Sequence, residues 1–266
     1  MANDIVLTAE GVSAGYRRHS HILHDVSFAV RSGEMVGIIG ANGAGKSTLL
    51  KTLRGLLPPL AGKVTVNGRS AESLRDREFA LEVGYLQQNV SLSFAYTARE
   101  IVMAGRYPRL KWWEREGVED EAVVDACMAY TGVAELAERS ILAMSGGQRQ
   151  RVLLAKVLAQ QTPLLFLDEP ATGLDIFYQE EIFGRELCRA GKTTLMVVHE
   201  LGLAAKFCSR LILVGCGTVV ADGTPDEVLT SENLSRAYEV PVRVVKNPLT
   251  DTVEVFTEPP PDDQRR

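Results

Sequence analysis

A turn with three glycines constrains this chain more than any other stretch. The segment GANGAGKSTL, residues 40–49, places Gly40, Gly43 and Gly45 just ahead of a lysine and two hydroxyl residues. The preceding apolar run, GEMVGIIG at 33–40, predicts a short buried strand. The following segment, KSTLLKTLRGLL at 46–57, has leucines at helical spacing and predicts a helix that stops before Pro58. The chain must therefore form a strand, a tight turn and a helix in direct succession.

The turn is built to hold an anion. Glycines leave the backbone N–H groups uncovered, and the helix that starts at Lys46 adds its positive dipole end. The pattern is the G-x-x-x-x-G-K-[ST] phosphate loop, in which the lysine reaches the outer phosphates and the Ser47 hydroxyl ligates Mg²⁺. A plain glycine-rich connection is the alternative. We expect the Lys46 side chain to face solvent when no ligand is bound. The predicted nucleotide-binding residues of the loop are Gly40, Asn42, Gly43, Ala44, Gly45, Lys46, Ser47 and Thr48.

Two adjacent carboxylates follow a second apolar run. In PLLFLDEP, residues 163–170, a buried strand ends in Asp168 and Glu169. The C-terminal edge of a parallel sheet is where ligands sit, so Asp168 is predicted to hold Mg²⁺ and Glu169 to deprotonate the attacking water. An ordinary strand exit into a solvated turn is the alternative. The phosphate loop favours the metal site, because a triphosphate carries Mg²⁺ and the metal needs a carboxylate.

A second helix start also favours an anion. MSGGQRQRVLLAKVLAQ, residues 144–160, begins with Ser145 as a good N-cap, and Gly146 and Gly147 leave their N–H groups uncovered. A capped surface helix would explain the serine but not two successive glycines, which are unfavourable in helices by about 1 kcal/mol each.

The composition limits the remaining function classes. The chain has 266 residues, a formal net charge of −5 and a pI near 5.5, which argues against a nucleic-acid surface. We find no apolar run of the ~20 residues needed to span a bilayer and no basic start typical of a signal peptide, so we expect a soluble, cytoplasmic chain. The four cysteines lie among apolar neighbours and are expected to be buried free thiols, and three histidines in RRHSHILHD are expected to be solvated rather than a metal site. These residues are Cys127, Cys188, Cys208, Cys216, His19, His21 and His24.

The coarse organisation is a β-rich start to about Thr65, a mixed stretch to Gln88, a helical stretch over 97–160, and alternating strands and helices to about Tyr238. PVRVVKNPLTDTVEVF then predicts a small hairpin, which we expect to cover a sheet edge. The tail PPPDDQRR, residues 259–266, is expected to be disordered.

In combination these motifs resemble the ATP-binding cassette (ABC) ATPases. GANGAGKST looks like their Walker A, LLFLDE their Walker B, and MSGGQ their signature, with Met144 in place of the usual leucine. The resemblance extends to four single residues, each of which alone would be read as an ordinary structural residue: a packed aromatic, a loop glutamine, a helix cap and a strand-end histidine. They are Tyr16, where the family stacks an aromatic on adenine, Gln88 of the Q-loop, Asp175 of the D-loop and the switch histidine His199.

The resemblance covers roughly residues 5–230, with departures at Gln87, where proline is common, and at Ala171-Thr172-Gly173. It implies an α/β fold: a P-loop NTPase cassette with a RecA-like core, an antiparallel β subdomain and a helical signature subdomain. The implied division is an ATPase domain over 1–240 with its helical subdomain at about 89–160, a hairpin extension at 241–258 and a tail at 259–266.

The resemblance also implies a mechanism. Two chains would sandwich two ATP molecules head-to-tail, each between Lys46 of one chain and Ser145 of the other, so we expect a homodimer with ATP and Mg²⁺ as cofactors. The implied catalytic residues are Glu169, His199, Gln88 and Asp175, the implied metal ligands are Ser47, Gln88 and Asp168, and the signature residues facing the nucleotide are Ser145, Gly146, Gly147 and Gln148.

The segment TAREIVMAGRYPRL, residues 97–110, resembles importer cassettes that serve ferric siderophores, haem and cobalamin. This likeness implies a membrane permease dimer and a separate substrate-binding protein, with the chain at the cytoplasmic face of the membrane. An exporter ATPase and a regulatory or assembly cassette are the alternatives, and the cargo is not encoded in this chain. Five aromatics are predicted to form a partner-docking groove, with a place in the helical core as the alternative: Phe94, Tyr96, Tyr107, Trp112 and Trp113.

Overall fold

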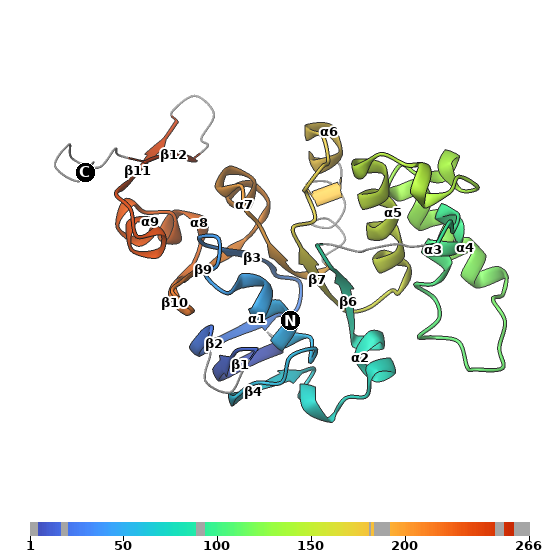
Figure 1. The fold of residues 1–266 in the computed structure, drawn as a ribbon, viewed down its shortest axis with the longest axis horizontal. Helices are drawn as coiled ribbons and strands as arrows, with labels where there is room; N and C mark the ends of the chain where they lie inside the picture. Colours follow the sequence, from blue (N-terminus) through green and yellow to red (C-terminus); the bar gives the residue numbers. More distant parts are fainter. Residues whose placement is uncertain are drawn as a thin grey trace. The chain divides into compact units, whose positions relative to one another are not determined.

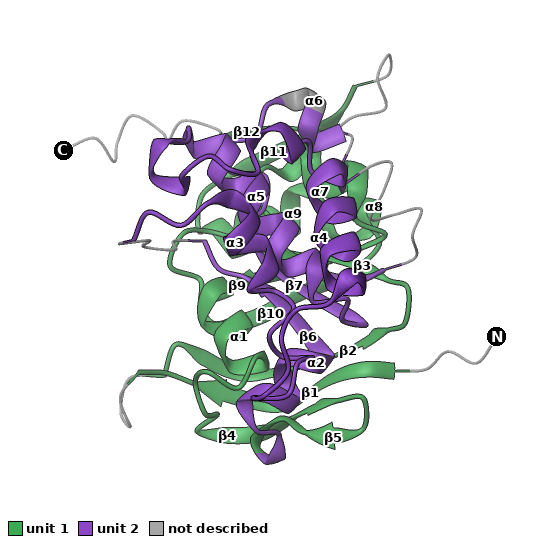
Figure 2. Cartoon of the chain, turned by 90° about the vertical axis from the view of Figure 1, so that its right-hand side faces the viewer, with its two compact units in different colours: residues 1–72, 195–266 green, residues 73–194 purple. Residues whose placement is uncertain are grey.

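The structure is a computed structural model that describes residues 5–16, 21–88, 94–180, 182–183, 192–247 and 253–257. The chain divides into two compact units, Met1–Glu72 with Leu195–Arg266, and Ser73–Thr194. Figure 2 colours the first unit green and the second purple. Two elements cross the division, the short helix η1 (Ala71–Ser73) and the strand β8 (Thr193–Val197).

Unit 1 contains an antiparallel sheet in the order β2-β1-β4-β5. It also contains the strand β3, which pairs in parallel with β9, and β9 continues into an antiparallel hairpin with β10. All five residues of β3 are buried, as expected for a strand covered on both faces. The elements of unit 1 are β1 (Ile5–Ala14), β2 (Leu23–Arg31), β3 (Met35–Ile39), α1 (Lys46–Leu53), β4 (Ala61–Val66), β5 (Arg69–Ser70), α7 (Leu201–Phe207), β9 (Arg210–Gly215), β10 (Thr218–Gly223), α8 (Pro225–Val228), α9 (Ser231–Tyr238), β11 (Val242–Lys246) and β12 (Val253–Thr257).

The strand, turn and helix predicted around the glycines are present as β3, the loop and α1. The helix is shorter than predicted and ends at Leu53, where Arg54 and then Gly55, at a φ of 75°, follow. Leu49, Leu50 and Leu53 are fully buried and anchor α1 in unit 1.

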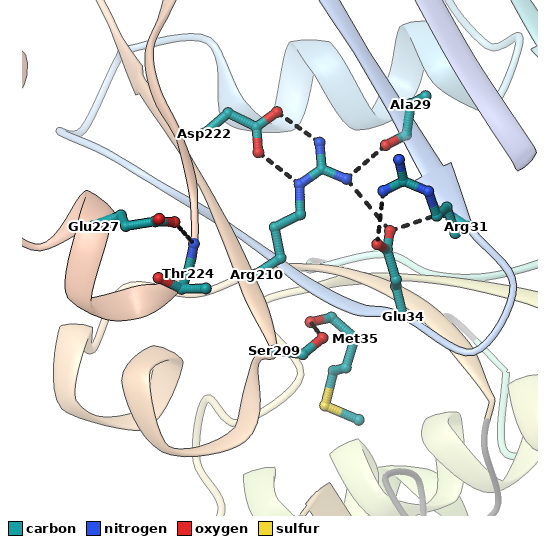
Figure 3. A network of polar contacts seen from close by, with 9 residues as sticks. All are labelled: Ala29, Arg31, Glu34, Met35, Ser209, Arg210, Asp222, Thr224 and Glu227. Carbon is teal, nitrogen blue, oxygen red and sulfur yellow. Dashed lines mark hydrogen bonds and ion pairs between the residues drawn. The ribbon is translucent and has the colours of Figure 1, made fainter. Parts of the chain in front are cut away.

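An arginine on β9 ties several strands of unit 1 together (Figure 3). The Arg210 guanidinium donates to both carboxylate oxygens of Asp222, at 2.6 and 2.7 Å, and to the Ala29 carbonyl at 2.8 Å. It also reaches Glu34 at 3.4 Å, which accepts from the Arg31 N–H. Two carboxylates and a carbonyl therefore satisfy this half-buried cation, and β2, β9 and β10 are fixed beside β3.

The C-terminal hairpin is present as predicted. β11 and β12 pair antiparallel and form a two-stranded sheet of their own, so they do not extend another sheet. That the hairpin covers a sheet edge stays a prediction. β11 lies against α9 and β12 against α7, and Val242 at the start of β11 is buried. The predicted disordered tail, residues 259–266, lies outside the described residues.

Unit 2 contains a parallel strand pair, β6 with β7, and a cluster of three helices. α3, α4 and α5 pack against one another, as Figure 1 shows, and each contributes a fully buried valine, namely Val102, Val124 and Val152. The elements of unit 2 are α2 (Asp76–Glu82), β6 (Val83–Leu86), α3 (Ala98–Met103), α4 (Val118–Tyr130), η2 (Ala134–Leu136), η3 (Ile141–Ala143), α5 (Gly146–Ala159), β7 (Leu164–Asp168) and α6 (Ile176–Gln179).

The cysteines differ in part from the prediction. Cys208 is buried and Cys127 half-buried, but Cys216 is exposed, because it occupies the tight turn between β9 and β10 with a φ of 47°. Cys188 and His19 lie outside the described residues. Among the residues that are described, no three His, Cys, Asp or Glu side chains gather as a metal site would require, and no helix has the length and apolarity of a membrane span.

Candidate functional site

The glycine-rich loop of unit 1 has the conformation that its sequence predicts. Gly40 has a φ of 145°, and a Cβ there would lie 2.0 Å from the Val214 carbonyl oxygen of β9, so only glycine fits. Gly43 has a φ of 82° with no other atom within 4 Å of its would-be Cβ. Gly45 is the N-cap of α1 and supplies no side-chain acceptor for the first N–H groups of the helix. The loop is therefore fixed at its base and open above Gly43, as a cradle for an anion requires.

Lys46 is not solvent-facing, contrary to our prediction. It is 6% exposed, and its ammonium donates to the carbonyl oxygens of Gly40 and Ala41 at 2.7 and 2.8 Å. The loop carbonyls replace water around the charge. The lysine thereby braces the loop and holds its charge at the start of α1.

The other residues of the loop lie around this lysine. Asn42 and Gly43 are exposed, Ser47 is half-buried, and Ala44 and Thr48 are buried.

Tyr16 follows β1 in the same unit and is held by helix α1. Its ring is more than half exposed, and Lys51 donates to its hydroxyl at 3.3 Å with the ammonium 5.7 Å from the ring centroid. Although partial burial raises the pKa of Tyr16, hydrogen bonds with Thr48 and Lys51 outweigh it and lower that pKa. Thr48 and Lys51 are one turn apart on α1, so the helix that starts at the phosphate loop also positions this aromatic ring. Lys51 was not among the residues predicted from the sequence. Its spacing of three residues from Thr48, which places both side chains on one face of the helix, was the available signal.

His199, also in unit 1, is exposed and lies between β8 and α7. Its position after a buried strand agrees with the sequence prediction of a histidine at a strand end.

The two carboxylates of unit 2 occupy the end of β7. Asp168 is the last residue of the strand and is 2% exposed, whereas Glu169 is half-buried. Glu169 has a φ of 52°, a left-handed conformation that is uncommon for a residue with a side chain. Its carboxylate accepts from the Thr172 hydroxyl at 3.3 Å, and the Gln150 amide of α5 lies 3.5 Å from its carbonyl oxygen. Strained backbone conformations of this kind are concentrated at functional sites.

The start of α5 has the predicted cap. Ser145 accepts from the Gln148 N–H at 3.3 Å, and the Gln148 side chain accepts from the Ser145 N–H at 3.1 Å, which completes a capping box. The two glycines differ: a Cβ on Gly147 would lie 2.5 Å from the Gly173 carbonyl oxygen, whereas one on Gly146 would have no atom within 4 Å. The close contact with Gly173 thus explains why residue 147 is a glycine. Gly146 has no such contact and leaves an open face at the start of the helix.

Two further predicted residues of unit 2 lie in turns. Asp175 accepts from the Tyr178 N–H at 3.1 Å and so caps α6, which is the ordinary structural role considered above. Gln88 is exposed just after β6.

Within unit 1 the structure therefore brings Tyr16 together with the loop at 40–48. Within unit 2 it brings the turn after β7 together with α5 and Gly173. Gln150 is a residue of this second group that the sequence reasoning missed.

The five aromatics predicted to dock a partner are all exposed. Trp112 is 90% exposed, and Trp112 and Trp113 form an edge-to-face pair with ring centroids 5.3 Å apart. They are not the core of the helical cluster.

Comparison with known proteins identifies the family. The family model described as ABC transporter matches residues 23–172, more than half of the chain. The chain belongs to the ABC transporter family. It is an ATP-binding ABC ATPase, and the family match includes the glycine-rich loop, the start of α5 and the carboxylates after β7.

Curated ABC relatives cover most of the chain. The hemin import ATP-binding protein HmuV of Streptomyces coelicolor is 43% identical over 256 residues, 94% of this chain and 89% of that protein. The ferric enterobactin transport ATP-binding protein FepC of Escherichia coli is 37% identical, covering 92% of each. The cobalamin import ATP-binding protein BtuD of Halobacterium salinarum is 41% identical over 240 residues, and the match spans 60% of that longer protein.

Solved structures show the same ABC fold. A metal-chelate type ABC transporter in an inward-facing conformation matches with a TM-score of 0.81 and 25% identity, over 96% of this chain and 98% of that one. The cassette MJ0796 in a dimeric post-hydrolysis state with ADP and phosphate matches with a TM-score of 0.74 and 26% identity, over 82% and 98%.

Proposed function

We propose that this chain is the ATP-hydrolysing subunit of an ABC importer that powers uptake of an iron complex, a ferric siderophore or haem, or of cobalamin. The observation that carries the proposal is the likeness to HmuV and FepC, each matched over more than nine-tenths of this chain. Their names specify import of hemin and transport of ferric enterobactin, two chelates of the class that the segment at 97–110 predicted.

The residues fit a bound nucleotide and its metal. The loop is open above Gly43 and has Lys46 at its base, so the N–H groups and the ammonium would bind the phosphates of ATP, with Tyr16 as the platform for the base. Ser47, Gln88 and Asp168 would supply the hydroxyl, amide and carboxylate oxygens that Mg²⁺ prefers. Bound Mg²⁺ would neutralise charge on the phosphates.

Glu169 is the proposed general base. It would take the proton of the attacking water, and the contacts of its backbone and side chain with Thr172 and Gln150 fix its direction. His199, Asp175 and Gln88 are the further catalytic residues of this proposal, and Gln88 would also link the nucleotide site to the permease.

We propose that two copies sandwich two ATP molecules, with Ser145, Gly146, Gly147 and Gln148 of one copy facing the nucleotide held by the other. The open face at Gly146 supports this arrangement. The dimer would sit at the cytoplasmic face of the membrane on a permease dimer, which receives cargo from a substrate-binding protein. The exposed aromatics between 94 and 113 support docking of the permease on the surface that they form, since aromatic residues are typical anchors of interfaces.

Glu169→Gln tests this proposal. It keeps the side-chain shape and removes the base, so hydrolysis is expected to fall 10²- to 10⁴-fold, about 3 to 5 kcal/mol of barrier, while ATP binding persists. By gel filtration with Mg-ATP the variant should run as a dimer while the wild type returns to monomer. Glu135→Gln, an exposed glutamate of η2, is the control and should behave as wild type. Hydrolysis at the wild-type rate would show that the base lies elsewhere, with His199 the next candidate.

The cargo is tested by reconstitution. The chain is co-purified with a polytopic permease, placed in vesicles, and ATP turnover is measured with haem, ferric siderophores or cobalamin on their binding proteins. Stimulation by one chelate names the class, and stimulation by none, with cargo leaving the cytoplasmic side, would indicate an exporter.

A further inference from the structure

A short segment of unit 2, residues 105–109, contacts the C-terminal end of α5. Arg106 donates to the Ala159 carbonyl at 2.8 Å. Arg109 donates to the Gln160 and Gln161 carbonyls at 2.8 and 2.6 Å. The last carbonyls of a helix lack partners in the helix and carry its negative dipole end, so two guanidinium groups are well matched to them. We call Arg106 and Arg109 the arginine clasp.

The backbone of this segment lies directly against α5, just before the clasp. A Cβ on Gly105 would lie 2.2 Å from the Lys156 carbonyl oxygen, so the backbone touches the helix directly. Arg106 is 4% exposed and pairs with Asp120 of α4 at 2.8 Å. The Gly117 N–H and Arg106 hold the pKa of Asp120 below its usual value, so this carboxylate is charged at neutral pH. The grip therefore includes α4 as well as α5.

The far side of the same segment is held from α2. Arg77 donates to the carbonyls of Pro108 and Leu110, each at 2.9 Å. Residues 107–113, the aromatic loop, include Arg109 and the two carbonyls that Arg77 holds, and their Tyr107, Trp112 and Trp113 are exposed. Arg77 thus holds the backbone of this loop, and Arg106 and Arg109 tie the segment to the end of α5, whereas the large side chains of the loop take no part in the core. Such fixing lowers the entropy lost when a partner binds.

We propose that the arginine clasp is a positioning device that transmits docking of the permease on the aromatic loop to Ser145 at the opposite end of α5. The helix has 14 residues and is about 21 Å long, and it joins the clasped carbonyls to the capped serine without a break. A displacement of the loop therefore moves the whole helix. This inference rests on the proposed function, since it needs a permease on the loop.

The test uses Arg109→Ala in the reconstituted complex of the ATPase with its permease, and measures basal and cargo-stimulated ATP turnover. Arg109 is exposed, so we expect the variant to fold and its basal turnover and ATP affinity to change by less than about twofold. Stimulation by cargo should fall at least about fivefold, while the permease still co-purifies. Arg109→Lys, which keeps one donor to the helix end, should recover part of the stimulation. Arg115→Ala, an exposed arginine beyond the aromatic loop, is the control and should keep it all.

The outcomes separate the two proposals. Full stimulation in Arg109→Ala would overturn the clasp and leave the importer proposal intact. Equal loss of basal and stimulated turnover would also overturn it, because the arginine would then only maintain the fold. A wild-type chain that neither binds a permease nor responds to cargo would refute the importer proposal itself.

Discussion

Two adjacent glycines at the start of α5 give opposite expectations for the same substitution. At Gly146 an added methyl group meets no atom within 4 Å, and the backbone has no positive φ, so Gly146→Ala should stabilise the fold by about 0.4–1 kcal/mol through the unfolded state. At Gly147 the methyl carbon would lie 2.5 Å from the Gly173 carbonyl oxygen, about 0.9 Å closer than the 3.4 Å of ordinary contact. The atoms that the methyl group would meet belong to the backbone of Gly173 and cannot easily move aside. Gly147→Ala should therefore lower the free energy of unfolding by about 1–3 kcal/mol.

The two variants are compared by urea unfolding and by ATP turnover of the isolated chain. We expect Gly146→Ala to be about 1.4–4 kcal/mol more stable than Gly147→Ala and yet to lose hydrolysis, because its open face is where the nucleotide of the second copy would lie. A destabilised Gly146→Ala, or a Gly147→Ala of wild-type stability, would refute the packing argument. Wild-type hydrolysis by Gly146→Ala would refute the assignment of its open face to nucleotide.

Four other predictions follow from single contacts. Lys51→Met should raise the Kd of ATP about 2- to 10-fold by releasing the Tyr16 ring and leave binding of inorganic triphosphate unchanged, as measured by calorimetry; equal losses for both ligands would contradict it. Lys46→Ala should abolish tight ATP binding. It should also lower the free energy of unfolding by about 1.5–3 kcal/mol per bond, because two hydrogen bonds of a buried ammonium are lost. Unchanged urea unfolding would contradict the bracing role of the lysine. Arg106→Ala should cost about 3–5 kcal/mol by leaving buried Asp120 unpaired, a loss that chemical denaturation would detect and that exposed Arg115→Ala should not share. Burial raises the pKa of the Cys127 thiol to about 11, so at about pH 10 the folded state keeps a proton that the unfolded chain loses. The contribution of this thiol to the free energy of unfolding is complete below pH about 9 and should fall between pH about 9 and 11. Cys127→Ala should remove that part of the pH dependence of unfolding.

The motifs were predictable because each combines a local backbone rule with a chemical requirement. The strand, glycine turn and helix around Lys46, the strand ending at Asp168 and the cap at Ser145 follow from periodicity and capping, which act over a few residues. The family resemblance then added Tyr16, Gln88, Asp175 and His199, whose roles stay predictions.

The contacts that the sequence could not supply are those between residues far apart in the chain. The buried position of Lys46 depends on where the loop carbonyls turn, and the fixed place of Gly40 depends on Val214 of β9. The hairpin at 242–257 shows the same limit: alternation predicts two paired strands but does not say which neighbour they contact. The clasp on α5 was hidden because arginines at 106 and 109 are ordinary surface residues until the helix end lies beside them.

The chain has two tryptophans, and both lie on the aromatic loop. Its indole fluorescence therefore comes entirely from one surface, and the high exposure of Trp112 places that emission near the wavelength of indole in water. Nucleotide binding at the glycine loop adds no indole of its own, so a blue shift on mixing the protein with a permease whose own tryptophans have been replaced reads out docking without a label.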